Sequence, residues 1–310
     1  MIKYALSFFL LIVVIQTQAQ VGSFLESGNE KLSKRNFEGA IQDYNRFLIN
    51  QPNNIDALCG RAEAKIDLGN YQEAKKDVEQ ALKLTPDNGR ALTLKGDVLF
   101  NMKDYTKALQ AYNEASRSKD KPDKAIVGKA KVMDQQGNSK EAYRILDEVI
   151  LHQPQNPEFY YARGLLNNST GKYARALLDF EKVISLNANF NSFGINFNRG
   201  ISFLNLSLLD NAIEAFNKAI GFDPQSATAY HSRGLANYQM ENYKESIDDF
   251  IKSDELNPNN PVTYYNLGMT YLKMNDKGNA CFYFHKSCRL NNTNACKMIV
   301  LECSDNSPKR

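Results

Sequence analysis

The sequence has no tryptophan, and it has only three histidines and five cysteines among 310 residues. The histidines, His152, His231 and His285, form no recognisable nucleophilic or metal-binding arrangement. His285 lies between two cysteines, and it would act as a ligand only if those cysteines were free. The sequence also lacks a glycine-rich loop that could cradle phosphates. We therefore expect no enzyme activity, no cofactor and no bound metal.

Charge of one sign is not concentrated anywhere in the chain. The 38 basic and 35 acidic residues give a formal net charge of +3, and basic residues are interleaved with acids through the sequence. A nucleic-acid-binding protein is expected to gather its basic residues into one stripe or patch. The composition therefore argues against a nucleic-acid partner.

The N-terminal apolar run is too short to cross a membrane. It extends from Ala5 to Ile15 with Ser7 as its polar break, whereas a spanning helix needs roughly 20 apolar residues. Lys3 precedes the run, and the small residues of Thr17-Gln18-Ala19 follow it. This pattern predicts a secretory signal peptide at 1–19, with Gln20 as the first mature residue. An uncleaved anchor is the alternative, and the absence of a following cysteine argues against a lipid anchor.

Small residues recur through the rest of the chain every 34 residues, with one slip of two residues. The first series is Gly28, Ala62, Gly96, Ala130, Gly164, Gly200, Gly234 and Gly268. The second runs twelve residues later: Ala40, Ala74, Ala108, Ala142, Ala176, Ala212, Ser246 and Ala280. Two small residues in each repeat allow two helices to pack closely. The period therefore predicts a stack of helix-turn-helix repeats.

Each repeat also carries large apolar residues at helical spacing and a break at its end. The large residues that we expect between successive repeats are Tyr44, Val78, Tyr112, Leu146, Phe180, Phe216, Phe250 and Phe284. Prolines end the second helix of five repeats, because proline cannot continue the preceding helix; they are Pro52, Pro86, Pro154, Pro224 and Pro258.

This pattern resembles the tetratricopeptide repeat family over about nine-tenths of the mature chain. The resemblance implies an all-α, right-handed α-solenoid of about eight helix pairs, whose first helices line a concave groove that binds a peptide or a partner's helix. We expect repeats one to five at 21–190, repeats six to eight at 191–294, a capping helix at 295–303 and a disordered tail at 304–310. Two extra residues near Asn191-Ser192 should lengthen the loop between repeats five and six and change the local twist. Proline is replaced at the repeat end by Asp120, Ala188 and Asn292.

Four of the five cysteines lie at the C-terminus. In an antiparallel hairpin centred on Asn292, Cys288 faces Cys296 and Cys281 faces Cys303. Packed helices bring such facing Cα atoms within reach of a disulfide. We therefore predict two bridges that attach the last helix to the final repeat. The segment from Cys288 to Cys296 also resembles the bridged hairpins of Sel-like repeats.

Two other interpretations of these cysteines are open. Four buried free thiols would serve as packing residues, and a four-cysteine zinc site would need converging thiolates at closer spacing. An export signal favours disulfides over both, because bridges persist in oxidising compartments. The remaining Cys59 is expected to be a packed small residue.

The family geometry places residues near the start of each first helix on the groove. The eleven expected in the last four repeats are Tyr161, Leu165, Phe197, Asn198, Ile201, His231, Ser232, Leu235, Tyr265, Asn266 and Met269. Aromatic side chains with interspersed amides suit an extended peptide, whose backbone amides can donate to and accept from asparagine. Packing between neighbouring helices, or self-association, would explain the same residues.

The first four repeats carry charge where the last four carry apolar residues. Their groove side has Asp56, Glu63, Asp67 and Asp97, followed by Lys124 and Lys131. A recurring set of arginines, Arg163, Arg199 and Arg233, matches a position beside the groove, and we interpret it as structural support.

We therefore predict a periplasmic or secreted scaffold that binds a protein or peptide, within a cell-envelope assembly and without a transmembrane segment in the mature chain. A receptor for an oligosaccharide or another small ligand is the alternative, because Tyr161, Tyr265 and Asn198 could stack on and hydrogen-bond to sugar rings. A purely structural spacer is a third interpretation.

Overall fold

The computed structural model describes residues 22–303. The predicted signal peptide at 1–19 and the predicted tail at 304–310 lie outside these residues. Every regular element of the described chain is helical, and consecutive helices pack as pairs. The all-α solenoid of helix pairs that the period predicts is confirmed.

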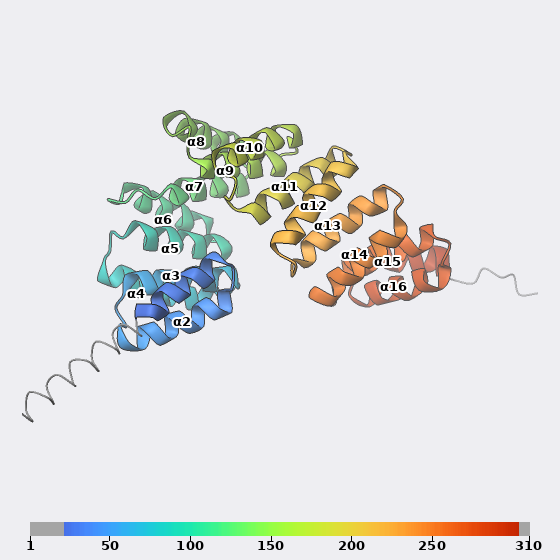
Figure 1. The fold of residues 1–310 in the computed structure, drawn as a ribbon, viewed down its shortest axis with the longest axis horizontal. Coiled ribbons are helices and arrows are strands. Elements are labelled where there is room, and N and C mark those ends of the chain that lie inside the picture. Colours follow the sequence, from blue (N-terminus) through green and yellow to red (C-terminus); the bar gives the residue numbers. More distant parts are fainter. Residues whose placement is uncertain (1–21, 304–310) are drawn as a thin grey trace, which may run out of the picture. The chain divides into compact units, whose positions relative to one another are not determined.

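Residues 22–33 form the first helix of repeat one, and the other first helices of the pairs follow at the repeat spacing. These are α3 (Ile55–Asp67), α5 (Gly89–Asn101), α7 (Asp123–Gln135), α9 (Pro157–Ser169), α11 (Ser192–Asn205), α13 (Ala227–Gln239) and α15 (Pro261–Lys273) (Figure 1). The second helices are α2 (Phe37–Asn50), α4 (Tyr71–Leu84), α6 (Tyr105–Arg117), α8 (Ser139–His152), α10 (Tyr173–Leu186), α12 (Leu209–Phe222), α14 (Tyr243–Leu256) and α16 (Lys277–Arg289).

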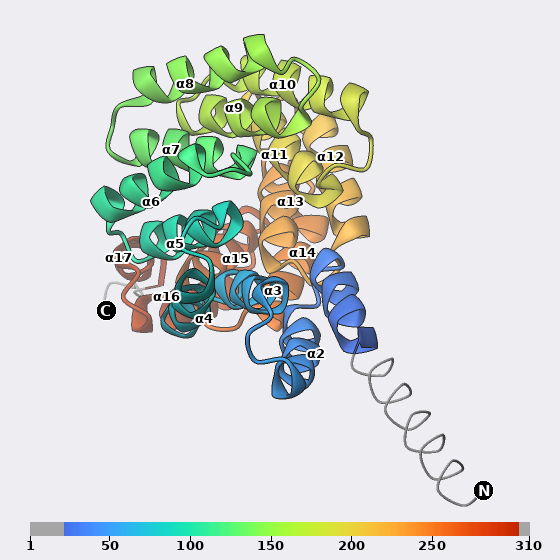
Figure 2. The ribbon, with the colours of Figure 1, turned by 90° about the vertical axis from the view of Figure 1, so that its left-hand side faces the viewer.

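The chain forms two compact units, Met1–His152 and Gln153–Arg310. In Figure 2 the helices of the N-terminal unit are coloured from blue to green, and each second helix lies beside the first helix of its own repeat. The boundary that we predict between residues 190 and 191 separates repeats and not compact units, and it stays a prediction.

The turn inside each repeat contains one residue with left-handed backbone. Gly69 has φ 78°, and the amide of Asn70 then donates to the carbonyl of Lys65, which closes the helix end. Other residue types adopt the same conformation at the equivalent turns, with positive φ at Arg35, Lys103, Ser207, Glu241 and Asn275. The repeat therefore imposes this conformation even where glycine is absent.

Asparagines begin most first helices. Asn54 accepts a hydrogen bond from the amide of Ala57, and Asn88 accepts one from that of Ala91. Such caps satisfy an amide that the first turn of a helix leaves without a partner. The loops between repeats therefore end in a sequence that favours helix initiation.

The first series of small residues is matched to the large residue sixteen positions later. A Cβ added to Gly164 would lie 2.6 Å from the ring of Phe180, and one added to Gly234 would lie 2.9 Å from that of Phe250. Where the small residue is alanine, its partner is an aliphatic side chain, as in the pairs Ala62/Val78 and Ala130/Leu146. Glycine thus makes room for an aromatic ring. The sequence predicts only that small residues let two helices approach closely, and the structure adds that each of these glycines faces one particular ring.

The two extra residues in repeat six are divided between the loop and the helix. Five residues, 187–191, separate α10 from α11, whereas four, 223–226, separate α12 from α13. The α11 helix has 14 residues, one more than α13. The loop is therefore longer, as expected, by one residue and not by two.

The described part of the chain ends in α17 (Thr293–Met298) and a π-helical turn, η1 (Ile299–Cys303). These elements pack against α16, and the buried residues there are Ala280, Phe284 and Ala295. Across residues 22–303, no helix has the length and apolar character needed to cross a membrane.

Candidate functional site: the inner face of the first helices

Successive first helices contact one another within each compact unit. In the C-terminal unit α9 packs on α11, α11 on α13 and α13 on α15, whereas successive second helices of the described chain do not make comparable contacts. First helices are therefore closer together than second helices, and their free side lies on the inside of the curve of each unit. We call this side the inner face.

The structure places ten of the eleven predicted groove residues in half-buried positions, and Ser232 in a buried one. The half-buried residues come from α9, α11, α13 and α15, one set from each repeat. None of the eleven is fully exposed. Each half-buried side chain therefore both packs against the protein and contributes to its surface.

The aromatic row of the inner face rests on the phenylalanines of the second helices. Each ring lies 5.2–6.0 Å from its partner's centroid, in a tilted arrangement that aromatic pairs favour. The pairs are Tyr161/Phe180, Phe197/Phe216, His231/Phe250 and Tyr265/Phe284. These contacts hold the rings in place, and each ring is still partly exposed at the surface.

Two further rings that sequence reasoning missed pack against this row, one from the longer loop before repeat six and one from the first turn of α11. Phe190 packs edge-on against Tyr161, with centroids 5.7 Å apart, and Phe193 stacks on Phe197 at 5.8 Å with planes 9° apart. The slip in the repeat period, flanked by two phenylalanines, was the available signal. The aromatic surface is therefore densest where repeats five and six meet.

The predicted amides are partly engaged within the protein. Asn198 Nδ2 donates to the carbonyl of Gly194 at 2.8 Å, and the backbone carbonyl of Asn198 accepts from Asn168 Nδ2 at 3.0 Å. Asn168 was not among the predicted site residues, although its amide joins repeats five and six. An asparagine side chain offers two donors and a carbonyl oxygen, so Asn198 keeps further capacity toward a ligand.

His231 joins repeats seven and eight in its neutral form. Its Nδ1 lies 3.1 Å from Thr263 Oγ1, and its Nε2 lies 3.3 Å from Asn266 Nδ2. Because an amide nitrogen can only donate, Nε2 accepts and the proton belongs on Nδ1. Burial lowers the pKa of His231, which favours this neutral state.

The inner face of the N-terminal unit is held by ion pairs. Glu63 Oε2 lies 3.1 Å from Arg90 Nη2, and Glu63 Oε1 lies 3.0 Å from Lys124 Nζ, so three first helices share one carboxylate. Burial opposes ionisation of Glu63, but the charges of Lys124 and Arg90 outweigh it and lower the pKa of Glu63. A cleft of about 330 Å³ lies beside this carboxylate, lined also by Arg35 and Asp67.

A second acid, Asp97, is hydrogen-bonded by a tyrosine of the second helix of its repeat. Tyr112 Oη donates to Asp97 Oδ1 at 2.7 Å. Burial raises the pKa of Asp97, against this hydrogen bond and the charge of Lys131, which lower it. Of the charged residues predicted for the first four repeats, Asp56, Glu63 and Lys124 are thus joined through Arg90, and Asp97 is bonded to Tyr112.

The recurring arginines support the fold, as predicted for two of the three. Arg163 Nη2 lies 2.7 Å from Asp179 Oδ1, and Arg233 binds Asp249 in the same way, each joining the two helices of one repeat. The Asp249 side chain is 6% exposed, so its pairing is a buried one. These arginines point beside the inner face and do not form a clamp for a ligand carboxylate.

Arg199 departs from this arrangement. The acid's position in repeat six is occupied by Ala215, and the Arg199 guanidinium lies over the ring of Phe203 at 5.6 Å. Its buried Nε has no hydrogen-bond partner among the described residues. Arg199 therefore does not share the ion pairing of Arg163 and Arg233, because the acid that would be its partner is missing.

Two disulfides attach the C-terminal elements to the last repeat, in the pairing predicted. Cys281 is bonded to Cys303 with Cα atoms 5.7 Å apart, and Cys288 to Cys296 with Cα atoms 4.8 Å apart. Both separations fall in the usual range for disulfides. The C-terminal cap, residues 293–303, is therefore covalently fixed over the end of the solenoid.

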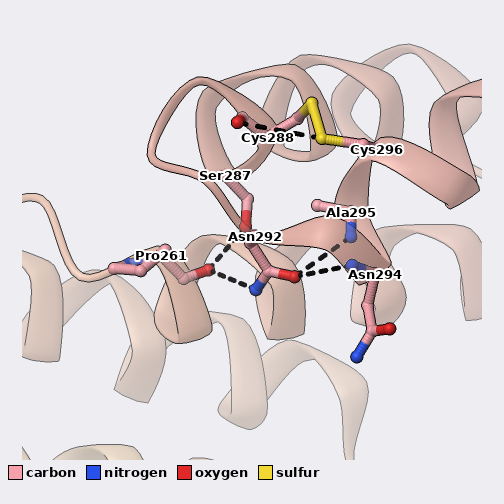
Figure 3. The surroundings of a disulfide bond; sticks show 7 residues. All are labelled: Pro261, Ser287, Cys288, Asn292, Asn294, Ala295 and Cys296. Atoms are coloured by element: carbon pink, nitrogen blue, oxygen red, sulfur yellow. Dashed lines mark hydrogen bonds between the residues drawn. A yellow bond between two sulfur atoms is a disulfide. The ribbon is translucent and has the colours of Figure 1, made fainter.

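Hydrogen bonds around Asn292 reinforce this attachment (Figure 3). Asn292 Oδ1 accepts from the amides of Asn294 and Ala295 at the start of α17, and its Nδ2 donates to the carbonyl of Pro261. Ser287 Oγ donates to that same carbonyl at 2.6 Å. The hairpin turn is therefore bonded to the start of α15, which carries the last residues of the inner face.

Cys59 is buried and free. Burial raises the pKa of its thiol to about 11, so the reactive thiolate is suppressed at neutral pH. In residues 22–303 no three histidine, cysteine or acidic side chains gather as metal ligands would.

Models of the family described as tetratricopeptide repeat match residues 59–122, 99–166, 157–190, 227–260 and 262–294, and a model described as TPR repeat matches 208–241. A comparison with curated proteins gave no match.

Solved structures agree on the fold. The chain is similar to the Cut9–Hcn1 hetero-tetramer of the APC/C, with a TM-score of 0.71 and 16% identity over 89% of this chain and 55% of that one. A tetratricopeptide repeat protein of Parabacteroides merdae aligns with a TM-score of 0.53 and 20% identity, over 81% of this chain and 99% of the other. MamA from Desulfovibrio magneticus aligns with a TM-score of 0.51 and 26% identity, over 55% of this chain and 95% of the other. With repeat matches through most of its length and the paired-helix fold, the chain belongs to the tetratricopeptide repeat family.

Proposed function

We propose that this protein is an exported, non-catalytic scaffold that binds an uncharged, apolar segment of a partner protein on the inner face of its C-terminal unit. The observation that carries the proposal is the row of half-buried aromatic rings in repeats five to eight, each held by a phenylalanine of the second helix. Rings that are already fixed lose little conformational entropy when a ligand packs against them.

The chemistry of this face favours a peptide over a sugar. Its second row consists of Leu165, Ile201, Leu235 and Met269, which offer apolar contacts between the rings. Part of the hydrogen-bonding capacity of Asn198 and Asn266 is used within the protein, so few polar groups remain for the many hydroxyls of an oligosaccharide. An apolar peptide with a few backbone hydrogen bonds fits better.

Export and membership of an envelope assembly are part of the proposal. The N-terminal sequence has the features of a secretory signal. Two disulfides at the C-terminus suit an oxidising compartment. Both features support a periplasmic or secreted location.

Selection of a peptide-display library against the mature chain, 20–310, tests the proposal. We expect selected peptides to be uncharged and apolar, and to lose binding at least tenfold to a Leu165→Glu, Met269→Glu variant of normal helicity, which places acids on the inner face. Lys131→Glu, at the same repeat position in the N-terminal unit, is the matched control and should leave binding unchanged. Equal binding by the double variant, or binding only to a glycan array, would overturn the proposal.

A further inference from the structure

A second recessed surface lies in the N-terminal unit, between α4 and α5. It is a cleft of about 360 Å³, and its floor consists of Val78, Leu82, Val98 and Leu99. Val78 and Val98 are each 1% exposed, so the floor is part of the core between repeats two and three. This volume falls at the lower end of the range typical of small-molecule sites.

The corresponding crevice of repeats two and seven is crossed by an arginine. In repeat two, Arg61 extends from α3 to bind Asn45 on the preceding helix and Asp77 on the following one. Arg233 makes the equivalent two bonds in repeat seven. In both repeats the crevice between successive helices is therefore filled by a guanidinium and its partners.

Repeat three lacks the arginine and the acid of this bridge, while Glu79 stands in the position of Asn45. Lys95 stands in the arginine's position, Ala111 in that of the acid, and Leu99 in that of Lys65, which supports Asp77 in repeat two. The Lys95 ammonium instead lies 3.8 Å from Glu114. Repeat three therefore lacks the guanidinium that crosses this crevice in repeats two and seven, and an open cleft with an apolar floor lies at this place.

The rim of this cleft is positively charged. Three of its lining residues are lysines, Lys75, Lys83 and Lys95, against one acid, Glu79, which lies 3.8 Å from Lys75. The lysine stems are flexible, so their ammonium groups can gather around an anion while their methylene groups extend the apolar wall. An apolar floor under a cationic rim is complementary to a molecule with an alkyl body and an anionic head.

We propose that the cleft between α4 and α5 binds an alkyl carboxylate, a molecule of the fatty-acid class, with its chain on the valine and leucine floor and its carboxylate among the three lysines. The site is independent of the proposed peptide-binding face, because its residues come from repeats two and three and none belongs to the C-terminal unit. The structure thus combines a protein-binding fold with a small-ligand site.

Octanoate titration of the mature chain tests the proposal, with methyl-labelled leucine and valine observed by NMR. We expect saturable shifts at Val78, Leu82, Val98 and Leu99, and no such shifts with octylammonium, whose charge the lysines repel. A Lys83→Ala, Lys95→Ala variant should bind octanoate at least tenfold more weakly. Lys129→Ala, at the same repeat position as Lys95 in repeat four, should keep the affinity of the parent.

A rebuilt variant, Lys95→Arg, Leu99→Lys, Ala111→Asp, gives repeat three the bridge of repeat two. Because repeat two folds with this set, the variant should fold while its cleft is closed, and we expect octanoate binding to disappear. Equal affinity for octanoate and octylammonium, absence of shifts at the four floor residues, or unchanged binding by the folded rebuilt variant would each overturn the proposal.

Discussion

The inner faces of the two compact units use the same helix positions for different chemistry. In the N-terminal unit, Glu63 is shared by Arg90 and Lys124, so charged side chains are fixed by one another. In the C-terminal unit, Tyr161 and Tyr265 occupy the inner face and are fixed by phenylalanines behind them. One repeat fold thus presents a charged surface in one unit and a largely apolar surface in the other.

Loss of the disulfides should produce the largest difference in stability between the two units. The bridges close loops with sequence separations of 22 and 8 residues, and removing all four cysteines by Cys→Ser substitution should destabilise the last repeat by about 5 kcal/mol. Because repeats are stabilised mainly by their neighbours, α15 to α17 should lose hydrogen-exchange protection while α3 to α6 keep theirs. Unchanged protection of α15 to α17 would show that the bridges do not hold the cap.

Removal of one of the recurring arginines should lower the free energy of unfolding more in the C-terminal unit than in the N-terminal unit. Arg233→Ala leaves the buried carboxylate of Asp249 with only the amide of Asn237, and we expect a loss of about 3 kcal/mol in urea unfolding. Arg61→Ala leaves Asp77 paired with Lys65 at 2.9 Å, so a loss of about 1 kcal/mol is expected. Arg199→Ala, which leaves no acid unpaired, is the control and should cost less than either. Equal losses in the free energy of unfolding for all three variants would contradict the importance assigned to these ion pairs.

The steric match between a glycine and the ring sixteen residues later can be tested by substitution. Gly164→Ala places a methyl group against Phe180 and should destabilise the protein by about 2 kcal/mol. Adding Phe180→Leu imitates the natural pair Ala130/Leu146 of the N-terminal unit, so the double variant should be more stable than the sum of the two single changes predicts. Additive losses in a double-mutant cycle would mean that the two residues are not matched.

The contributions of Asp97 in the N-terminal unit and His231 in the C-terminal unit should depend on pH in opposite directions, with the smallest of these effects. Burial raises the pKa of Asp97, so the native state holds that proton more tightly than the unfolded state, and stability from this group is lost as pH rises from about 4. Burial lowers the pKa of His231, so stability from this group is present above pH ~6.5 and is lost as pH falls below it.

Denaturant unfolding of two variants across pH measures these contributions. Asp97→Asn should be more stable than the parent at pH 7, and this advantage should vanish below pH ~4. His231→Gln should be less stable than the parent at pH 7, with a difference that narrows as the pH falls. Differences that are independent of pH would contradict the assigned ionisation states.

The period of 34 residues was sufficient to predict the helix pairs and their spacing, because the small residues that it aligned are required by packing against a ring. The disulfide pairing followed from the hairpin geometry around Asn292 alone. In both cases a regular backbone determines which side chains meet.

Features that depend on a single repeat could not be predicted in this way. Phe190 and Phe193 reach the inner face only because the two-residue slip is divided between a loop and a helix. The isolation of Arg199 depends on Ala215, sixteen residues away. The cleft between α4 and α5 lies where Lys95 stands in place of the arginine of repeats two and seven. To find each of these features, equivalent positions in different repeats must be compared. That comparison is informative only when the contacts made at those positions in one repeat are known.

The salt dependence of peptide binding tests the central claim most directly. A peptide selected on the mature chain should bind with the same dissociation constant, within about twofold, at 0.05 M and 0.5 M salt, because the aromatic face of the C-terminal unit is uncharged and screening has little to act on. Binding that weakens more than tenfold with salt and is lost in Lys131→Glu would place the site on the charged face of the N-terminal unit and contradict the account.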